Sequence, residues 1–201
     1  MDSSHYFTGE MLQPPQLRFN PSRRSRVKLQ IYDDSQRLGK SSINAALIYP
    51  VHLSGARKVV VEGLTHGCGT FQGVASLFRI PIRFINERPA NMEDEADIRR
   101  EIRAVLGEKP DVVVLLTSNR NQRLYAMAKA ELLGNGVPSQ VITAEKLSAP
   151  EQAQWTLANV ALQIYGKIGG TPWTVMSASP QRELVLGVSR ALDPQKNMVI
   201  G

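Results

Sequence analysis

The sequence predicts an α/β protein with a Rossmann-like parallel sheet flanked by helices on both faces. Short apolar runs of strand length alternate along the chain with longer segments whose apolar residues recur at helical spacing. The composition, with 42% hydrophobic and 21% charged residues, is that of an ordinary folded chain. Strands that alternate with helices in this way are typical of a parallel sheet covered on both sides. A short β segment is expected after the last helix.

We expect four strands. Ile43 to Tyr49 (INAALIY) is a short apolar run that Pro50 stops, which is the pattern of a buried strand. Residues 81–85 (PIRFI) and 112–116 (VVVLL) repeat that pattern, and residues 140–143 (QVIT) are a shorter version of it.

Three segments are expected to be helices. Residues 93–106 place Ile98, Ile102, Val105 and Leu106 on one face, and the pairs Glu95–Arg99 and Asp97–Arg100 fall at helical spacing on the other. Residues 121–133 and 150–168 form the other two, which glycine-containing turns at 134–136 and 169–170 bring to an end.

The segment around residues 58–61 (KVVV) is ambiguous. Its three valines favour a strand, yet Ser54 could cap a helix that runs through Val60 and Leu64 toward Gly67. Propensity alone does not decide between the two.

Charge and cysteine content exclude several classes of protein. The chain has a net charge of +6 and a single cysteine. The positive surplus weakly indicates a polyanionic partner, and one cysteine cannot build a disulfide framework, which favours a cytoplasmic protein. Its three histidines are too scattered for the common His-cluster metal motifs. No apolar run approaches the ~20 residues of a membrane span, so no membrane partner is expected.

Residues 1–42 differ from the rest and are expected to form a basic arm or linker. The first forty residues contain three prolines, and seven basic residues stand there against four acidic ones. Such a segment could lie along a phosphate backbone or be a solvated basic loop.

Three apparent motifs do not meet the requirements of a site. Gly39-Lys40-Ser41 resembles the end of a P-loop, but Asp34 stands where that motif needs glycine. Gly67-Cys68-Gly69 with Gly73 has the wrong spacing for a dinucleotide fingerprint and is better explained as a turn, with Cys68 a packing thiol. The acidic cluster at 93–97 opens a helix, where carboxylates interact favourably with the positive end of the helix dipole. This explanation is preferred to a metal site.

One constellation remains, in residues 119–170. Tyr125 and Lys129 are four residues apart on one helix face, and Gln140 stands at the entrance of the next strand. Asn159, Gln163 and Lys167 follow at i, i+4 and i+8 and form one polar stripe on the last helix. Ammonium and amide groups with an aromatic ring nearby have the chemistry of a monophosphate pocket with a stacked base. Each pair alone is common in structural roles, and it is the joint spacing that favours a ligand site.

At these residues the sequence resembles the MID domain of prokaryotic Argonaute and Piwi proteins. Tyr125, Lys129, Gln140 and Lys167 match the phosphate-pocket pattern of the family, and the string NVALQIYGKIGGTPWTV (159–175) looks like its junction between MID and PIWI domains. The resemblance covers about residues 16–201. After the basic arm expected at 1–42 from composition, it implies a MID-like domain at 43–170 and the start of a PIWI (RNase H-like) domain, incomplete, at 171–201. It also favours a helix at 54–67.

The resemblance implies binding of the 5′-phosphorylated end of a guide RNA or DNA that recognises a complementary target strand. The two lysines, Gln140 and the stripe of Asn159 and Gln163 would hold the phosphate, while the first base stacks on Tyr125. A Mg²⁺ ion bridging guide phosphates would use Gln163 as a ligand.

Cleavage is not expected. In the family a catalytic acid follows a strand of the type hydrophobic-hydrophobic-Gly-x-Asp, and this chain reads LVLGVS at 184–189, with Ser189 in the place of the acid. A serine cannot hold a catalytic metal as a carboxylate does. Inactive members of the family often act through an effector protein. The alternative is a Rossmann-like enzyme or sensor whose pocket holds a free mononucleotide.

Overall fold

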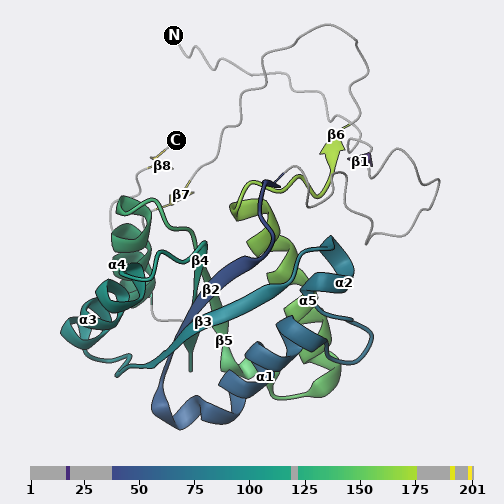
Figure 1. Ribbon diagram of the computed structural model, residues 1–201. Helices are drawn as coiled ribbons and strands as arrows, with labels where there is room; N and C mark the ends of the chain where they lie inside the picture. The colour runs from purple at the N-terminus through teal and green to yellow at the C-terminus, as the bar shows by residue number, and fades with distance from the viewer. Residues whose placement is uncertain (1–16, 19–37, 119–121, 176–190, 193–198, 201) are drawn as a thin grey trace, which may run out of the picture. The chain divides into compact units, whose positions relative to one another are not determined.

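A computed structural model (Figure 1) describes residues 17–18, 38–118, 122–175, 191–192 and 199–200. Ser189 lies outside these residues, as does most of the basic arm (1–42). Leu17–Thr174 forms one compact unit, and the short hairpin of β7 (Ala191–Leu192) and β8 (Val199–Ile200) belongs to a second unit. Two further short strands, β1 (Leu17–Arg18) and β6 (Thr174–Val175), pair with each other. The boundaries at 42 and 170 stay predictions.

A four-stranded sheet lies at the centre of the larger unit, in the order β3-β2-β4-β5. The strands are β2 (Ile43–Tyr49), β3 (Ile82–Pro89), β4 (Val112–Thr117) and β5 (Ser139–Thr143). Every pairing within this sheet is parallel, which confirms the predicted sheet and all four strands. β3 runs four residues past its predicted end because a register shift opposite Ala45/Ala46 lets it continue to pair with β2.

Helices cover both faces of this sheet, which confirms the predicted fold class. On one face α1 (Ser54–His66), α2 (Val74–Phe78) and α5 (Pro150–Lys167) contribute to one apolar core cluster. On the other, α3 (Glu95–Leu106) and α4 (Gln122–Gly134) pack on a second cluster. Figure 1 shows α3 and α4 together, apart from α1 and α5. No described helix has the length and apolar character that a membrane span needs.

The ambiguous segment is a helix, as the family resemblance implied. Val60 and Leu64 are fully buried, so tertiary packing overrides the strand propensity of the valine run. The expected cap at Ser54 is wrong, because a short 3₁₀ turn at Val51–Leu53 leads into the helix and Leu53 occupies the cap position. The glycines at 67, 69 and 73 all have positive φ, so this stretch is a turn as expected.

The charged residues of the rejected motifs have structural roles. Asp94 caps α3 by accepting a hydrogen bond from the Ala96 N–H at 2.9 Å, as expected for a carboxylate at a helix start. The Lys40 ammonium of the P-loop look-alike lies 2.6 Å from Asp111 Oδ1.

Of the two expected ion pairs within α3, Asp97–Arg100 forms and Glu95–Arg99 does not. Glu95 pairs with Arg123 at 2.6 Å, and Arg99 pairs with Glu131 at 2.9 Å. Both partners lie on α4, so these carboxylates and guanidiniums join α3 to α4.

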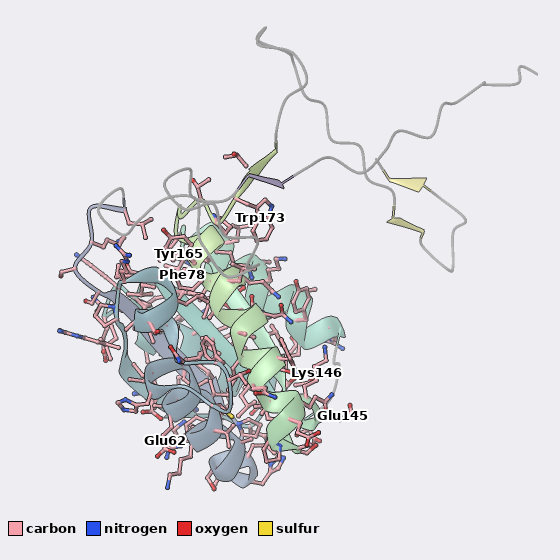
Figure 2. The ribbon with its side chains drawn as sticks, turned by 90° about the vertical axis from the view of Figure 1, so that its right-hand side faces the viewer. Glu62, Phe78, Glu145, Lys146, Tyr165 and Trp173 are labelled. Atoms are coloured by element: carbon pink, nitrogen blue, oxygen red, sulfur yellow. The ribbon has the colours of Figure 1, made fainter. Side chains whose placement is uncertain are left out.

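Two stacked aromatic rings lie near the carboxyl end of α5. The buried rings of Tyr165 and Phe78 lie parallel, with centroids 4.3 Å apart (Figure 2). The chain then turns through Gly170, whose N–H donates to the Tyr165 carbonyl oxygen at 2.9 Å. A Cβ at Gly170 would overlap the Tyr165 ring. The glycine therefore allows the backbone to pass directly over the ring.

Gly170→Ala is expected to lower the free energy of unfolding by about 1–3 kcal/mol, because the stacked ring has no room to move away from a methyl group. Gly166→Ala is the control. Gly166 is exposed within α5 and a Cβ there meets nothing within 4 Å, so the gain in helix propensity should stabilise by up to about 1 kcal/mol. Urea titrations of both variants measure the difference, and equal stabilities would contradict this account of Gly170.

Candidate functional site

The six residues of the predicted pocket, five for the phosphate and Tyr125 for the base, come together at β5, an edge strand of the sheet. The helix before it, α4, supplies Tyr125 and Lys129, and Gln140 is the second residue of β5 itself. The helix after it, α5, carries Asn159, Gln163 and Lys167. The carboxyl end of α5 returns to the start of β5, where the Lys167 ammonium meets the Ser139 carbonyl and the Gln140 side chain. The fold thereby brings Lys167 to residues that stand 28 and 27 positions earlier in the chain.

Lys167 is fixed by two hydrogen bonds. Its Nζ donates to the Ser139 carbonyl oxygen at 2.6 Å and to Gln140 Oε1 at 2.7 Å. Gln140 is itself only 7% exposed, and its Nε2 donates to the Val141 carbonyl oxygen at 3.2 Å. Partial burial lowers the pKa of Lys167 below its ordinary value, and the nearby charge of Lys129 lowers it further. An anion at this position would relieve both effects.

Lys129 is held by Tyr125. The Lys129 Nζ donates to the Tyr125 hydroxyl oxygen at 2.8 Å and lies 5.1 Å from the centre of the ring. The ring is 44% exposed, so part of it stays open to a ligand. Neither Lys129 nor Lys167 has a carboxylate within 4 Å among the described residues. Two positive charges therefore stand close together without a described counter-ion.

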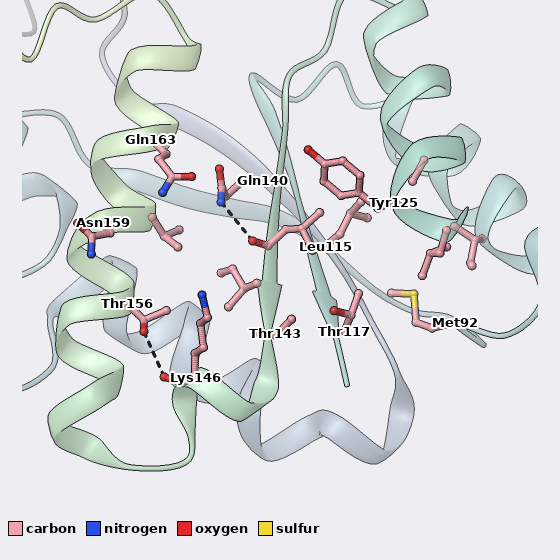
Figure 3. Close-up of a pocket in the computed structure, with 16 residues that line it drawn as sticks. Met92, Leu115, Thr117, Tyr125, Gln140, Thr143, Lys146, Thr156, Asn159 and Gln163 are labelled. Atoms are coloured by element: carbon pink, nitrogen blue, oxygen red, sulfur yellow. Dashed lines mark hydrogen bonds between the residues drawn. The ribbon is translucent and has the colours of Figure 1, made fainter. Parts of the chain in front are cut away.

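A cavity of about 490 Å³ runs beside these groups (Figure 3). Its lining includes Tyr125, Gln140, Asn159 and Gln163, while the two lysines are outside the lining and bind residues within it. The remaining walls are mainly apolar, with Leu115, Leu124, Ala128 and Val160 among them. Described acidic side chains are absent from the lining. The arrangement suits a ligand with one anionic group and one flat apolar group.

Four polar residues of this cavity were not predicted. They are Thr117, Thr143, Lys146 and Thr156. Thr156 could have been found by extending the α5 stripe by three residues, since i and i−3 share a helix face. Lys146 and Thr143 lie at the carboxyl end of β5, and only the tertiary structure places them beside α5. The Thr117 hydroxyl is buried without a hydrogen-bond partner.

The site lies away from the switch point of the sheet, although switch points and loops are where ligands of open α/β sheets usually bind. The strand order reverses between β2 and β4. An adjoining cavity, lined by Pro50, His52, Asn91 and Ser118 among others, occupies that position and shares Met92, Thr117 and Leu124 with the first. The predicted residues lie along the β5 edge instead, because two of the three elements that carry them are the helices on either side of that strand.

Removing the charge of Lys129 is expected to raise the pKa of Lys167 toward its ordinary value. Burial, the larger cause of the lowered pKa, persists in a Lys129→Met variant, so the recovery should be partial. NMR titration of isotope-labelled lysine side chains measures this pKa. Lys58→Met, which changes the same charge on α1 beside Glu62, should leave it unchanged. An unaltered Lys167 pKa in Lys129→Met would show that the two ammoniums do not interact.

Comparison with known proteins identifies relatives of this chain in sequence. Residues 111–201 match the Piwi domain family. The chain is 38% identical over 78 residues to a protein argonaute of Cereibacter sphaeroides, and 31% identical over 85 residues to the Piwi-like protein Ago3 of Bombyx mori. These alignments cover 38% and 42% of this chain, and 10% and 9% of the two relatives. A bacterial and an insect protein both match, so the prokaryotic assignment stays a prediction.

Solved structures agree on the fold. Drosophila Piwi superposes with a TM-score of 0.63 at 18% identity, over 94% of this chain and 26% of that one. Clostridium butyricum Argonaute, solved with a guide DNA and a 19-mer target DNA, superposes with a TM-score of 0.59 at 19% identity, over 84% of this chain and 25% of that one. The described chain thus has the α/β fold of part of an Argonaute or Piwi protein, and it resembles those proteins in sequence.

Proposed function

We propose that this chain binds the 5′-phosphorylated end of a guide RNA or DNA, in the manner of a MID domain, for recognition of a complementary target strand. The observation that supports this most directly is the pair of lysines without described carboxylate partners, Lys129 and Lys167, held beside Gln140 and the exposed ring of Tyr125. Similarity to the Piwi domain family over residues 111–201 also supports it.

A terminal phosphate fits this arrangement better than a weaker anion. Two ammoniums can neutralise a phosphate monoester, which carries nearly two charges at neutral pH and three acceptor oxygens. Gln140, Asn159 and Gln163 can donate to the remaining oxygens from their amide groups. The half-exposed Tyr125 ring offers a surface on which the first base can stack. A free mononucleotide would satisfy the same groups and is the alternative ligand.

A Mg²⁺ ion at this site would depend on the nucleic acid. Gln163 lines the cavity and can offer an amide oxygen, whereas Gln140 Oε1 already accepts from Lys167. Within the described part of the chain no cluster of three or more His, Cys, Asp or Glu side chains could hold a metal. The residues therefore fit an ion that is bound mainly by phosphate oxygens, with Gln163 as the contribution of the protein.

Removing the 5′-phosphate is expected to abolish most of the affinity for a single strand. Lys129→Ala and Lys167→Ala should each cost on the order of 1–3 kcal/mol, because each removes a charged hydrogen bond to the phosphate. Titration of 5′-phosphorylated and 5′-hydroxyl RNA and DNA strands, with and without Mg²⁺, measures these losses. Lys58→Ala serves as the control for a general change of charge.

The outcome that would overturn the proposal is equally clear. A Lys129→Ala, Lys167→Ala double variant that binds phosphorylated strands as tightly as the unaltered protein would show that the pocket lies elsewhere. Equal affinity for phosphorylated and hydroxyl strands would have the same meaning. Affinity should also fall as salt increases if several phosphates are engaged, and a bound mononucleotide would show a weaker dependence.

We further propose that binding occurs without cleavage, with any effect passed to an effector protein. The sequence at position 189, where the family pattern has an acid, supports this. The chain incubated with guide, complementary target and Mg²⁺ should leave the target intact on a denaturing gel. Cleavage of the target at one defined position by the unaltered protein, together with no cleavage by Lys129→Ala, would contradict the proposal.

A further inference from the structure

A second cavity, the switch-point cavity, lies where the strand order of the sheet reverses. β2 pairs with β3 on one side and with β4 on the other, and both pairings are parallel, so the carboxyl ends of the three strands lie at one edge of the sheet. The residues that follow these strands line the cavity, among them His52 after β2, Asn91 after β3 and Ser118 after β4. Ligands of open α/β sheets usually bind at this position, and a volume of about 490 Å³ suits a small molecule.

One polar group of the switch-point cavity has no partner. Thr117, the last residue of β4, is 7% exposed, and its Oγ1 has no hydrogen bond within the described structure. Thr117 and Met92 line both the switch-point cavity and the cavity beside β5, and Figure 3 shows the Met92 side chain directed toward Thr117. A buried hydroxyl without a partner costs free energy. A bound molecule that supplies the missing hydrogen bond would remove this cost.

The walls of the switch-point cavity are held by the protein itself. His52 Nε2 and Ser118 Oγ lie 3.0 Å apart, so a hydrogen bond joins the segments that follow β2 and β4. Asn91 Oδ1 accepts from the Glu93 N–H at 3.1 Å, and the Asn91 N–H donates to Asp97 Oδ2 at 2.7 Å. The Asn91 Nδ2 has no acceptor among the described residues. The cavity is therefore already formed, with an amide donor available to a ligand.

The chemistry of the lining favours a nucleobase over an anion or a metal ion. No lysine or arginine is among the described lining residues, and Glu93 contributes a carboxylate, so a phosphate is disfavoured. No described cluster of three or more His, Cys, Asp or Glu side chains could hold a metal. Hydroxyl, amide and carboxylate groups pair with the polar edge of a base, and the apolar side chains of Val51, Met92 and Leu124 can contact its faces. A nucleobase combines these two kinds of surface.

We propose that the switch-point cavity binds a nucleobase, free or as a nucleoside, with the Thr117 hydroxyl and the Asn91 amide hydrogen-bonded to its edge. This site goes beyond the proposed guide binding. It requires no phosphate, and Lys129, Gln140 and Lys167 are absent from its described lining. Because the two cavities share three lining residues, a bound base lies next to the proposed strand site.

Nucleosides test this site, because they lack the phosphate that the cavity beside β5 is proposed to bind. Adenosine, guanosine, cytidine and uridine are each titrated into isotope-labelled protein and followed by NMR. We expect at least one of them to bind saturably and to shift the amide resonances of Asn91, Thr117 and Ser118. Thr117→Val should weaken that binding by roughly 5-fold, as for one lost hydrogen bond. Asn91→Asp, which keeps the acceptor for the Glu93 N–H and loses the amide donor, should weaken it by a similar factor.

Two further variants identify the cavity that is occupied. Thr143→Val removes a hydroxyl that lines only the cavity beside β5, and it should leave the nucleoside affinity unchanged. Tyr125→Ala removes the aromatic surface of that same cavity. Loss of nucleoside binding in Tyr125→Ala, together with unchanged binding in Thr117→Val, would place the base in the cavity beside β5 and overturn the inference.

The stability of Thr117→Val distinguishes a role in ligand binding from a structural role. Valine has a similar shape without the hydroxyl, so the urea midpoint of the free protein should rise when the unpaired group is removed. A lower midpoint would show that the hydroxyl is already paired in the free protein and would contradict the inference. So would the failure of all the nucleosides to bind saturably. Neither result changes the dependence of strand binding on the 5′-phosphate, so the inference and the proposed function fail separately.

Discussion

The contact on which the site depends is the one between the Lys167 ammonium and the start of β5. Two acceptors, the Ser139 carbonyl oxygen and Gln140 Oε1, hold this ammonium at 2.6 and 2.7 Å. Because Lys167 is the last residue of α5, the contact joins the end of that helix to the start of the edge strand. Gln163 and Asn159 lie one and two turns earlier on the same face of α5, whose opposite face packs in the core. The contact thus places the end of this polar row beside β5.

The same contact carries an electrostatic cost. A partly buried ammonium beside a second ammonium is less favourable than either would be in water, and the lowered pKa of Lys167 expresses this. Neutral oxygens orient the charge but do not cancel it. An anion bound here, as proposed, would offset this repulsion. The described ion pairs between α3 and α4, by contrast, join carboxylates to guanidiniums and leave little charge for a ligand.

How much of this could be predicted from sequence depends on how local each feature is. The four strands and the helices α3, α4 and α5 follow from apolar periodicity, and the row from Asn159 to Lys167 follows from helix geometry alone. The helix at 54–66 does not follow from the sequence, because its valines favour a strand. Only the burial of Val60 and Leu64 in the folded protein makes the segment helical. Lys146 could not be predicted either. No repeat or motif marks it, and its neighbour Thr156 is brought to it by the turn between β5 and α5.

The distribution of uncompensated charge carries more information than its total. The net charge of +6 would allow weak attraction to any polyanion, and such attraction is screened beyond about 8 Å at physiological salt. Recognition needs charges that are close to the ligand and are not already paired. In the described unit, Lys129 and Lys167 lie beside one end of a single cavity and Lys146 lies at the other, with the Tyr125 ring in its lining. Unpaired cations beside an aromatic surface are the groups that the proposed binding of a nucleic-acid end would use.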